Sequence, residues 1–358
     1  MRILQIATYY ETYLREFHRV RPHLQERSYA EQLGCLLDDS FGAGHLIAPH
    51  LAARGHEAEL IVANWVSGQA RWARENGLFP PSGAAEAIAL CVEQVNRFDP
   101  DVLYLLDPIT LDAGFVAALK RRPRLVLGWR QANIPDGTDW TGFDLMLSAD
   151  PVCRKRACEL GARSTALYRP GFPDWILPRL SPRNPEVDVV FVGNVTPEHS
   201  ARLALLEAVA RGAEQGRYTA AFHLGNHSGS DLPPAIARIS RPPAWGTALY
   251  QATRSGRIGL NIHIDITGAA MNMRILETAG CGTLLLTEAD PELASLLAPG
   301  LEVAAYDRGE DLPERIEALL ADRVGLEAMA SRGQARVLKD HSMAARAEWF
   351  ERIVLEHS

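Results

Sequence analysis

The chain has 358 residues, of which 47% are hydrophobic and 23% are charged, and its formal net charge at pH 7 is -7. This length exceeds what one hydrophobic core usually organises, so we expect two domains, and the ordinary composition argues against long disordered tracts. The acidic balance, without a dense run of Lys or Arg, argues against a nucleic-acid partner, because neutralising phosphates requires clustered cations.

The cysteines and the N-terminal segment indicate the cellular compartment. Five cysteines are widely spaced and form no C-x-x-C pair, so neither a disulfide framework nor a zinc site is indicated. The first apolar stretch is only six residues long, too short for a signal peptide or a bilayer span. We therefore expect a reduced, cytoplasmic protein without a membrane span.

In the first half of the chain, short apolar runs alternate with longer helical patterns, which is typical of βα units around a parallel sheet. The apolar pattern from Ser28 to Arg54 contains Gly42 and Gly44, which predict two helices joined at the glycines. Residues 1–169 are therefore predicted to form a first Rossmann-like domain. The predicted strands are Ile3–Thr8, Ala58–Ala63, Val102–Leu106, Leu125–Trp129, Leu145–Ser148 and Thr165–Tyr168.

Five prolines within residues 170–185 predict an interdomain linker, because fixed φ angles and missing N–H donors do not suit a sheet. After this segment the βα pattern restarts, which predicts a second Rossmann-like domain over residues 186–340. Its predicted elements are the strand Asp188–Asn194, a helix near Ser200–Arg211, the strand Ala220–Leu224, a helix near Leu249–Thr253, the strand Ile258–Ile262, a helix near Ala270–Ala279, the strand Thr283–Leu286, and three final helices, the last over His341–Leu355.

In open α/β sheets, ligands bind at the carboxyl ends of strands, so residues that follow the apolar runs are the site candidates. Gly193 and Asn194 end the first strand of the second domain. The glycine would let backbone amides approach a ligand, and the asparagine could bind a base or a phosphate. A plain strand-to-helix turn is the simpler interpretation of the same two residues.

Residues 261–288 contain a second set of candidates. A strand ends near His263, a loop with Gly268 follows, and the free amides at the start of the next helix would form a positive pocket for a diphosphate. Arg274 in the first turn could neutralise a leaving nucleoside diphosphate, and Glu277 could accept hydrogen bonds from vicinal ribose hydroxyls. The alternative is an intrahelical Arg–Glu pair that stabilises the helix by only ~0.3 kcal/mol.

This region carries a family resemblance. The stretch ILETAGCGTLLLTE resembles the donor-site helix and strand of glycogen-synthase-like glycosyltransferases, whose usual form is E-x7-E-A-x-x-x-G-x-P-v-v. More closely, WGTALYQATRSGRIGLNIHI, MNMRILETAGCGTLLLTE and RGQARVLKDHSMAARAEWF resemble the spore-maturation CgeB-like glycosyltransferases. The N-terminal string PHLQERSYAEQLGCLLDDSFGAGHLIAPHLAARGHEAELIVAN also resembles that group. The resemblance covers most of the chain and is densest over residues 186–350.

The resemblance implies the GT-B fold: two Rossmann-like domains whose parallel sheets face each other across a cleft, and a C-terminal helix, here residues 341–358, that packs back on the first domain. It implies a nucleotide-sugar donor, with UDP favoured, and neither a catalytic metal nor a cofactor. Glu277 matches the second glutamate of the pattern, which contacts the nucleotide ribose. Ala269 replaces the first glutamate, so the group that contacts the sugar hydroxyls is open, with Asp265 and Asn272 as candidates.

An inverting transfer needs a general base that deprotonates the acceptor, and His45 or Asp107 of the first domain could serve. Each residue also has a structural interpretation, because His45 could be a cap or packing residue and Asp107 precedes Pro108 and could form a turn. A retaining enzyme would need neither base. In that case Arg274 and the helix dipole would stabilise the negative charge of the leaving phosphate.

Glycosyl transfer to an unidentified acceptor, which could be a glycan, a protein or a small molecule, is the leading hypothesis. A nucleotide-sugar epimerase of the same fold and a non-catalytic nucleotide-sugar-binding protein are the alternatives. An NAD-dependent dehydrogenase is disfavoured, because ATYYET stands after the first strand where G-x-G-x-x-G would be expected.

Overall fold

The computed structural model describes residues 1–195, 200–225, 232–263, 272–307, 309 and 311–357. The chain divides into two compact units, of which the first contains Met1–Pro170 and Arg346–Ser358 and the second contains Gly171–Ala345. Each unit is built around a six-stranded sheet, and every strand pair in the two sheets is parallel. Both units are therefore α/β, as predicted from the alternating apolar and helical patterns.

The first sheet has the strand order β2-β1-β3-β4-β5-β6, with β2 at one edge. Its strands are β1 (Arg2–Ala7), β2 (Glu57–Val62), β3 (Val102–Leu105), β4 (Leu125–Trp129), β5 (Leu145–Ser148) and β6 (Thr165–Leu167). The helices of this unit are α1 (Glu11–Arg19), η1 (Pro22–Glu26), α2 (Tyr29–Asp38), η2 (Ala43–His45), α3 (Ala48–Ala53), α4 (Val66–Glu75), α5 (Ala84–Phe98), α6 (Ala113–Ala117), α7 (Pro151–Glu159) and α14 (Met343–His357), most of which belongs here.

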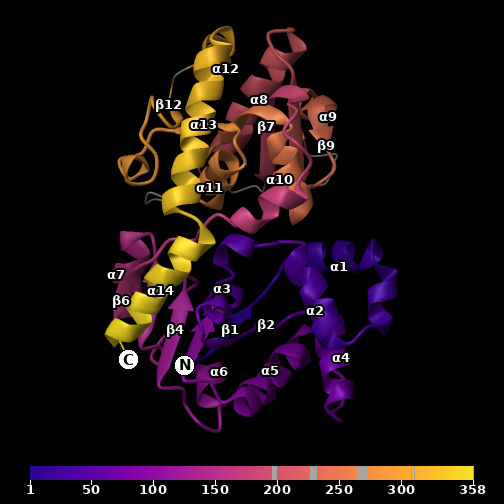
Figure 1. Ribbon diagram of the computed structural model, residues 1–358, viewed down its shortest axis with the longest axis vertical. Helices are drawn as coiled ribbons and strands as arrows, with labels where there is room; N and C mark the ends of the chain where they lie inside the picture. The colour runs from indigo at the N-terminus through magenta and orange to yellow at the C-terminus, as the bar shows by residue number, and fades with distance from the viewer. Residues whose placement is uncertain (196–199, 226–231, 264–271, 308, 310, 358) are drawn as a thin grey trace. The chain divides into compact units, whose positions relative to one another are not determined.

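Helices cover both faces of the first sheet, as a buried parallel sheet requires. Helices α5 and α6 contribute Val95 and Phe115 to one hydrophobic core, together with Leu4 of β1. On the opposite face, the ring of Phe350 in α14 lies 4.9 Å from that of Tyr104 and 5.8 Å from that of Tyr168. The C-terminal helix therefore packs on the sheet of the first unit (Figure 1).

The second sheet has the strand order β12-β11-β10-β7-β8-β9. Its strands are β7 (Val187–Asn194), β8 (Ala220–Gly225), β9 (Ser240–Arg241), β10 (Gly256–Asn261), β11 (Leu284–Glu288) and β12 (Ala304–Tyr306). The helices are η3 (Asp174–Arg179), α8 (Ser200–Glu214), α9 (Pro234–Ile239), α10 (Thr247–Arg254), α11 (Met273–Gly280), η6 (Leu293–Ser295), α12 (Leu312–Ala321) and α13 (Arg323–Asp340).

Two hydrophobic cores flank the second sheet. Helices α8, α9 and α12 pack on one face, through residues such as Leu206 and Ile316. Helices α10, α11 and α13 pack on the other face, where Ile275 and Val337 are buried. Helices thus cover both faces of the sheet. The edge formed by the carboxyl ends of its strands can form a ligand site.

The proline-rich segment packs into the second unit. Phe172 is fully buried, and a Cβ at Gly280 of α11 would lie 2.4 Å from its ring. Ile176 in the short helix η3 is fully buried in the same core. The chain between the two sheets is therefore docked on the second unit along part of its length.

The predicted strands are all present, with ends that differ from the prediction by at most two residues. The predicted pair of helices joined at glycines is also present, as α2 and α3, with η2 between them and Gly42 at φ +62°. The strands β9 and β12 at the two edges of the second sheet were not predicted, because runs of two and three residues give no periodic signal. Among the described residues, no helix is long and apolar enough to cross a membrane.

Candidate active site

The strand order of the second sheet changes direction between β7 and β10. β8 and β9 lie beyond β7 on one side, whereas β11 and β12 lie beyond β10 on the other. In an open α/β sheet, the crevice at the carboxyl ends of the strands at such a switch point is the usual ligand site. The donor-site candidates that lie at this edge are Gly193, Asn194, His263, Asn272, Arg274 and Glu277. Two others, Asp265 and Gly268, fall outside the described residues.

Arg274 lies in the first turn of α11 and its guanidinium reaches back over the end of β7. Its Nε donates to the carbonyl of Val192 at 2.8 Å, and its Nη1 donates to Oδ1 of Asn261 at 2.9 Å. The guanidinium also lies 4.7 Å from the centre of the Phe191 ring, in a cation–π contact. Among the described residues, Nη2 makes no hydrogen bond, so this nitrogen is left to donate to a ligand.

Gly193 allows this arrangement. A Cβ built at residue 193 would lie 2.4 Å from Nη2 of Arg274, which is closer than real Cβ contacts come. The side-chain oxygen of Asn194 occupies the space that a side chain at Gly225 would need, because an ideal Cβ at residue 225 would lie 2.4 Å from this oxygen. These two residues therefore shape the edge of the sheet.

Arg202 is a further cation at this edge, and no motif in the sequence predicts it. Its Nη1 donates to the carbonyl of Asn194 at 2.9 Å and its Nη2 to the carbonyl of Ile262 at 3.0 Å, which ties the ends of β7 and β10 together. The side chain is 4% exposed. Its signal in the sequence is its place in α8, because residues 202, 206 and 209 share the buried face of that helix.

The two guanidinium groups act on each other. Burial and the charge of Arg202 lower the pKa of Arg274 to about 9, and the nearby carboxylate of Glu277 opposes this shift. Arg274 therefore stays protonated at neutral pH. Two positive charges therefore meet the positive end of the α11 helix dipole at this edge, an arrangement whose charge suits an anion.

Glu277 lies one turn after Arg274 on α11 and is only partly exposed. In the part of the chain that the structure describes, its carboxylate accepts no hydrogen bond. Burial raises the pKa of Glu277 to about 7, and the positive charge of Arg274 lowers it only in part. The carboxylate is thus available to accept hydrogen bonds from a ligand, and its charge changes near neutral pH.

The end of β10 is fixed to β11. The backbone N–H of His263 donates to Oε2 of Glu288 at 2.9 Å, and its Nε2 lies 3.4 Å from Oγ1 of Thr287. The Nδ2 of Asn261 donates to the same hydroxyl at 2.9 Å. All of these residues are buried, so His263 is part of a structural network. Asn272 precedes α11, and its buried Oδ1 has no partner among the described residues.

In the first unit, the switch point lies between β1 and β3, and Asp107 follows the end of β3 by two residues. His45 is the last residue of the short helix η2. The imidazole of His45 lies 5.4 Å from the ring of Trp129, which ends β4. Buried Gln5 holds the loop, because its Nε2 donates to the carbonyl of His45 at 2.7 Å and its Oε1 accepts from the amides of Ile47 and Ala48. Burial lowers the pKa of His45 to about 4, so the ring is neutral at pH 7.

Both carboxylate oxygens of Asp107 accept hydrogen bonds. Oδ2 accepts a hydrogen bond from the hydroxyl of Thr8 at 2.9 Å. Oδ1 accepts longer hydrogen bonds from the amides of Ile109 and Thr110, at 3.4 and 3.3 Å. The side chain therefore closes the turn after β3, which is the structural interpretation that its position before Pro108 suggested. Within the described residues, no hydrogen bond or ion pair joins His45 to Asp107.

Comparisons with known proteins bear on this site. Residues 175–352 match the model of a family described as "Glycosyl transferase-like". No curated protein sequence matches the chain significantly.

Among solved structures, HepE of Anabaena in complex with UDP and glucose is similar, with a TM-score of 0.62 and 13% identity over 99% of this chain and 100% of that one. The sucrose-phosphate synthase of Thermosynechococcus elongatus has a TM-score of 0.59 and 12% identity, over 99% and 98% of the two chains. AviGT4, a glycosyltransferase involved in avilamycin A biosynthesis, has a TM-score of 0.53 and 16% identity, over 87% and 86%. These similarities, with the two parallel sheets, confirm the predicted GT-B fold.

Proposed function

We propose that this protein, a glycosyltransferase with the GT-B fold, transfers a sugar from a nucleoside diphosphate sugar to an acceptor. The match of residues 175–352 to a glycosyl transferase-like family confirms the enzyme class predicted from the sequence. The observation that carries the proposal for the donor is the pair of guanidinium groups, Arg274 and Arg202, at the switch point of the second sheet. A diphosphate is the ligand whose charge this edge complements.

In the proposed reaction, the bond between the anomeric carbon and the phosphate oxygen breaks, and negative charge develops on the departing nucleoside diphosphate. Nη2 of Arg274 and the positive end of the α11 helix dipole stabilise this charge. Glu277 accepts hydrogen bonds from the ribose hydroxyls, which fits its unoccupied carboxylate. Arg202 holds the ends of β7 and β10 in place and adds positive charge.

UDP is the favoured nucleotide. The similar HepE structures were determined with UDP and with UDP-glucose, although at 13–14% identity these ligands are properties of that protein. We also propose that transfer needs no metal ion, because two arginines supply the positive charge that the leaving diphosphate requires. Activity that survives EDTA would support this point, and activity that returns only with a divalent cation would contradict it.

If the acceptor must be deprotonated, we propose His45 as the general base in preference to Asp107. The His45 ring is neutral and makes no hydrogen bond with the described residues, so its lone pair is free to take a proton. The oxygens of Asp107 already accept hydrogen bonds from Thr8 and from turn amides.

We also propose a family subgroup and a cellular compartment for the protein. We place the chain in the CgeB-like subgroup because of the strings around Trp245–Ile264 and Met271–Glu288. We place it in the cytoplasm because all five cysteines are free.

A thermal-shift screen of UDP, GDP, ADP and CMP and their sugar conjugates tests the donor. A nucleotide present at 100 times its dissociation constant should add ~2.7 kcal/mol to the stability of the folded protein. We expect UDP or a UDP-sugar to give the largest shift, and Arg274→Ala to reduce the shift that UDP causes. A screen in which no nucleotide raises the melting temperature would contradict the proposal.

A further inference from the structure

Among the described residues, the guanidinium of Arg274 is held by neutral groups alone. Its Nε donates to the carbonyl of Val192 at 2.8 Å, and its Nη1 donates to Oδ1 of Asn261 at 2.9 Å. The charge of Glu277 acts on it from the next turn of α11, but the two side chains form neither a hydrogen bond nor an ion pair. No described carboxylate therefore neutralises this cation directly.

Other partly buried arginines of the second unit are paired with carboxylates. Arg183 lies 3.0 Å from Glu327, and Arg257 lies 3.4 Å from Asp188. Such pairing is usual for a guanidinium that leaves water, because a lone charge loses its hydration without compensation. Arg274 bears that cost, since burial lowers its pKa to about 9. A charge kept without a counter-ion under these conditions is typical of functional sites.

Asn261 is fixed in the sheet at the point where it meets Arg274. It ends β10 and lies in register with Thr287 of β11, and both residues are fully buried. Nδ2 of Asn261 donates to Oγ1 of Thr287 at 2.9 Å, which leaves Oδ1 to face the arginine. Because a guanidinium can only donate, this orientation of the amide is the one that binds it.

The Asn261→Asp substitution would keep this hydrogen bond and reverse its electrostatic effect. A carboxylate has nearly the shape of the amide and accepts from Nη1, while the Thr287 hydroxyl can turn to donate to it. The new charge would neutralise the guanidinium and repel an anion at the same edge. The neutral amide thus fixes Arg274 and leaves its positive charge to act on a ligand.

We propose that Asn261 is a positioning residue that holds Arg274 without neutralising it, and that Thr287 sets the orientation of the Asn261 amide. The inference rests on the proposed function, because it requires the charge of Arg274 to act on the diphosphate of a nucleotide. If Asn261 served only the fold, a carboxylate that keeps the same hydrogen bonds would leave ligand binding unchanged.

Titration of the full-length protein with UDP and with uridine separates charge from shape, because uridine lacks the diphosphate. Asn261→Asp should bind UDP about tenfold more weakly, since it adds a full negative charge beside the diphosphate site. Its affinity for uridine should equal that of the unaltered protein. Turnover of a UDP-sugar should fall by a similar factor or more, and the melting temperature checks that the variant is folded.

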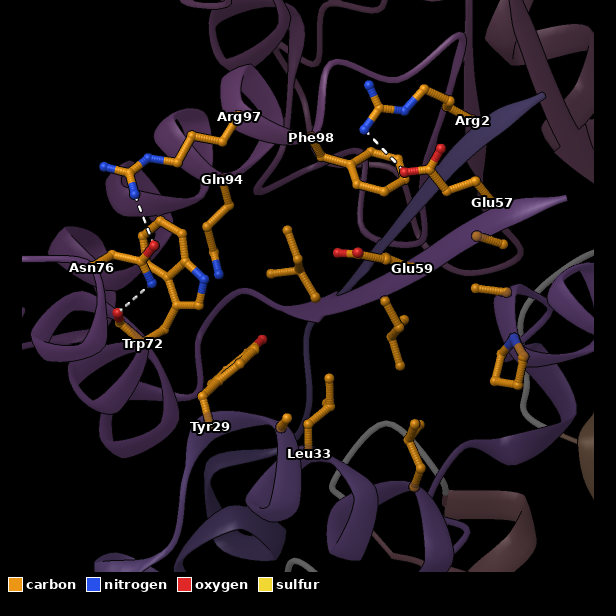
Figure 2. Close-up of a pocket in the computed structure, with 17 residues that line it drawn as sticks. Arg2, Tyr29, Leu33, Glu57, Glu59, Trp72, Asn76, Gln94, Arg97 and Phe98 are labelled. Carbon is orange, nitrogen blue, oxygen red and sulfur yellow. Dashed lines mark hydrogen bonds and ion pairs between the residues drawn. The ribbon is translucent and has the colours of Figure 1, made fainter.

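Asn76→Asp is the matched control. In the first unit, Oδ1 of Asn76 accepts from Nη1 of Arg97 at 2.8 Å, so this substitution creates an Arg–Asp pair of the same kind (Figure 2). Neither residue belongs to the candidate active site. We expect this variant to bind UDP and uridine as the unaltered protein does.

Thr287→Val adds no charge, and it decides the matter if Asn261→Asp does not fold. It removes the hydroxyl that orients the Asn261 amide, so the affinity for UDP should fall several-fold while the affinity for uridine stays the same. Thr287→Ser keeps the hydroxyl and should bind UDP as the unaltered protein does.

The inference alone is overturned if folded Asn261→Asp, or Thr287→Val in its place, binds UDP as tightly as the unaltered protein. It is also overturned if UDP and uridine are weakened equally, because an equal loss reflects a distorted site. If the unaltered protein binds neither UDP nor uridine, the proposed function is overturned together with it.

Discussion

The guanidinium of Arg274 occupies the space that a side chain at Gly193 would need, with Nη2 lying 2.4 Å from an ideal Cβ at that residue. The carbonyl of Val192, one residue earlier, accepts from Nε of the same guanidinium at 2.8 Å. At the end of β7, the carbonyl of Val192 therefore holds the guanidinium, and the missing side chain at Gly193 leaves space for it. The sequence alone suggested instead that this missing side chain leaves space for a ligand.

Gly193→Ala should displace the guanidinium, because the new methyl group and Nη2 cannot occupy the same space. We expect the affinity for UDP to fall about tenfold while most of the fold stability is retained, since the arginine is flexible at its far end. Isothermal titration measures this change. Gly34→Ala in α2, where nothing lies within 4 Å of the new Cβ, is the matched control. Equal UDP affinity in both variants would show that the position of Arg274 does not matter.

Arg274→Ala should lower turnover by ~10²-fold or more, because a charge that acts on the departing phosphate contributes mainly in the transition state. Donor hydrolysis or transfer, followed by release of nucleoside diphosphate, measures it. Arg211→Ala removes an exposed arginine of α8 that pairs with Glu207, and should have little effect. Unchanged turnover in a folded Arg274→Ala variant would leave this arginine with only its structural contacts.

The raised pKa of Glu277 makes stability depend on pH. Below pH 4.5 the folded and unfolded states are both protonated at this group, and between pH 4.5 and about 7 only the folded state keeps the proton. The stability that the protonated group provides is therefore lost as pH rises through this window. Glu277→Gln should not show this loss, and should gain ~2 kcal/mol relative to the unaltered protein between pH 5 and pH 8.

Chemical denaturation at these two pH values measures the difference. Glu356→Gln, which removes an exposed carboxylate of α14, is the control. If the stabilities of the Glu277→Gln and Glu356→Gln variants change with pH in the same way, Glu277 ionises in the folded protein as a solvated carboxylate would.

His45→Gln tests the proposed base. The pKa of His45 is about 4, so kcat/KM should be constant near neutral pH and fall as the ring becomes protonated below about pH 5. The variant should lose ~10²-fold or more in turnover. Asp107→Asn should instead lower stability by ~1 kcal/mol, because it weakens the hydrogen bonds that close its turn, and should change turnover little. The reverse outcome would make Asp107 the better candidate.

The fold could be predicted to a large extent because strand periodicity is local. The strands β4 and β5 were predicted to the residue, since each is a short buried apolar run. The packing of Phe172 against Gly280 could not be predicted, because it joins residues far apart in the sequence through a segment whose prolines indicate only a linker.

The candidate site was predictable in part for the same reason. Arg274 and Glu277 follow a strand and begin a helix, which is a local pattern. Arg202 contributes through hydrogen bonds to the carbonyls of Asn194 and Ile262, and the spacing of residues in α8 does not predict these bonds. A single arginine on an apolar helix face was its only signal.

The most direct test of the central claim compares UDP with 2′-deoxy-UDP by isothermal titration at pH 8, where the Glu277 carboxylate is mostly ionised. If Glu277 binds the ribose at the switch point of the second sheet, the unaltered protein should prefer UDP about tenfold, because a charged acceptor strengthens hydrogen bonds from hydroxyls. Glu277→Gln should lose most of this preference, and Glu277→Ala should lose all of it. A preference that survives in both variants, or no binding of UDP to the unaltered protein, would contradict the account.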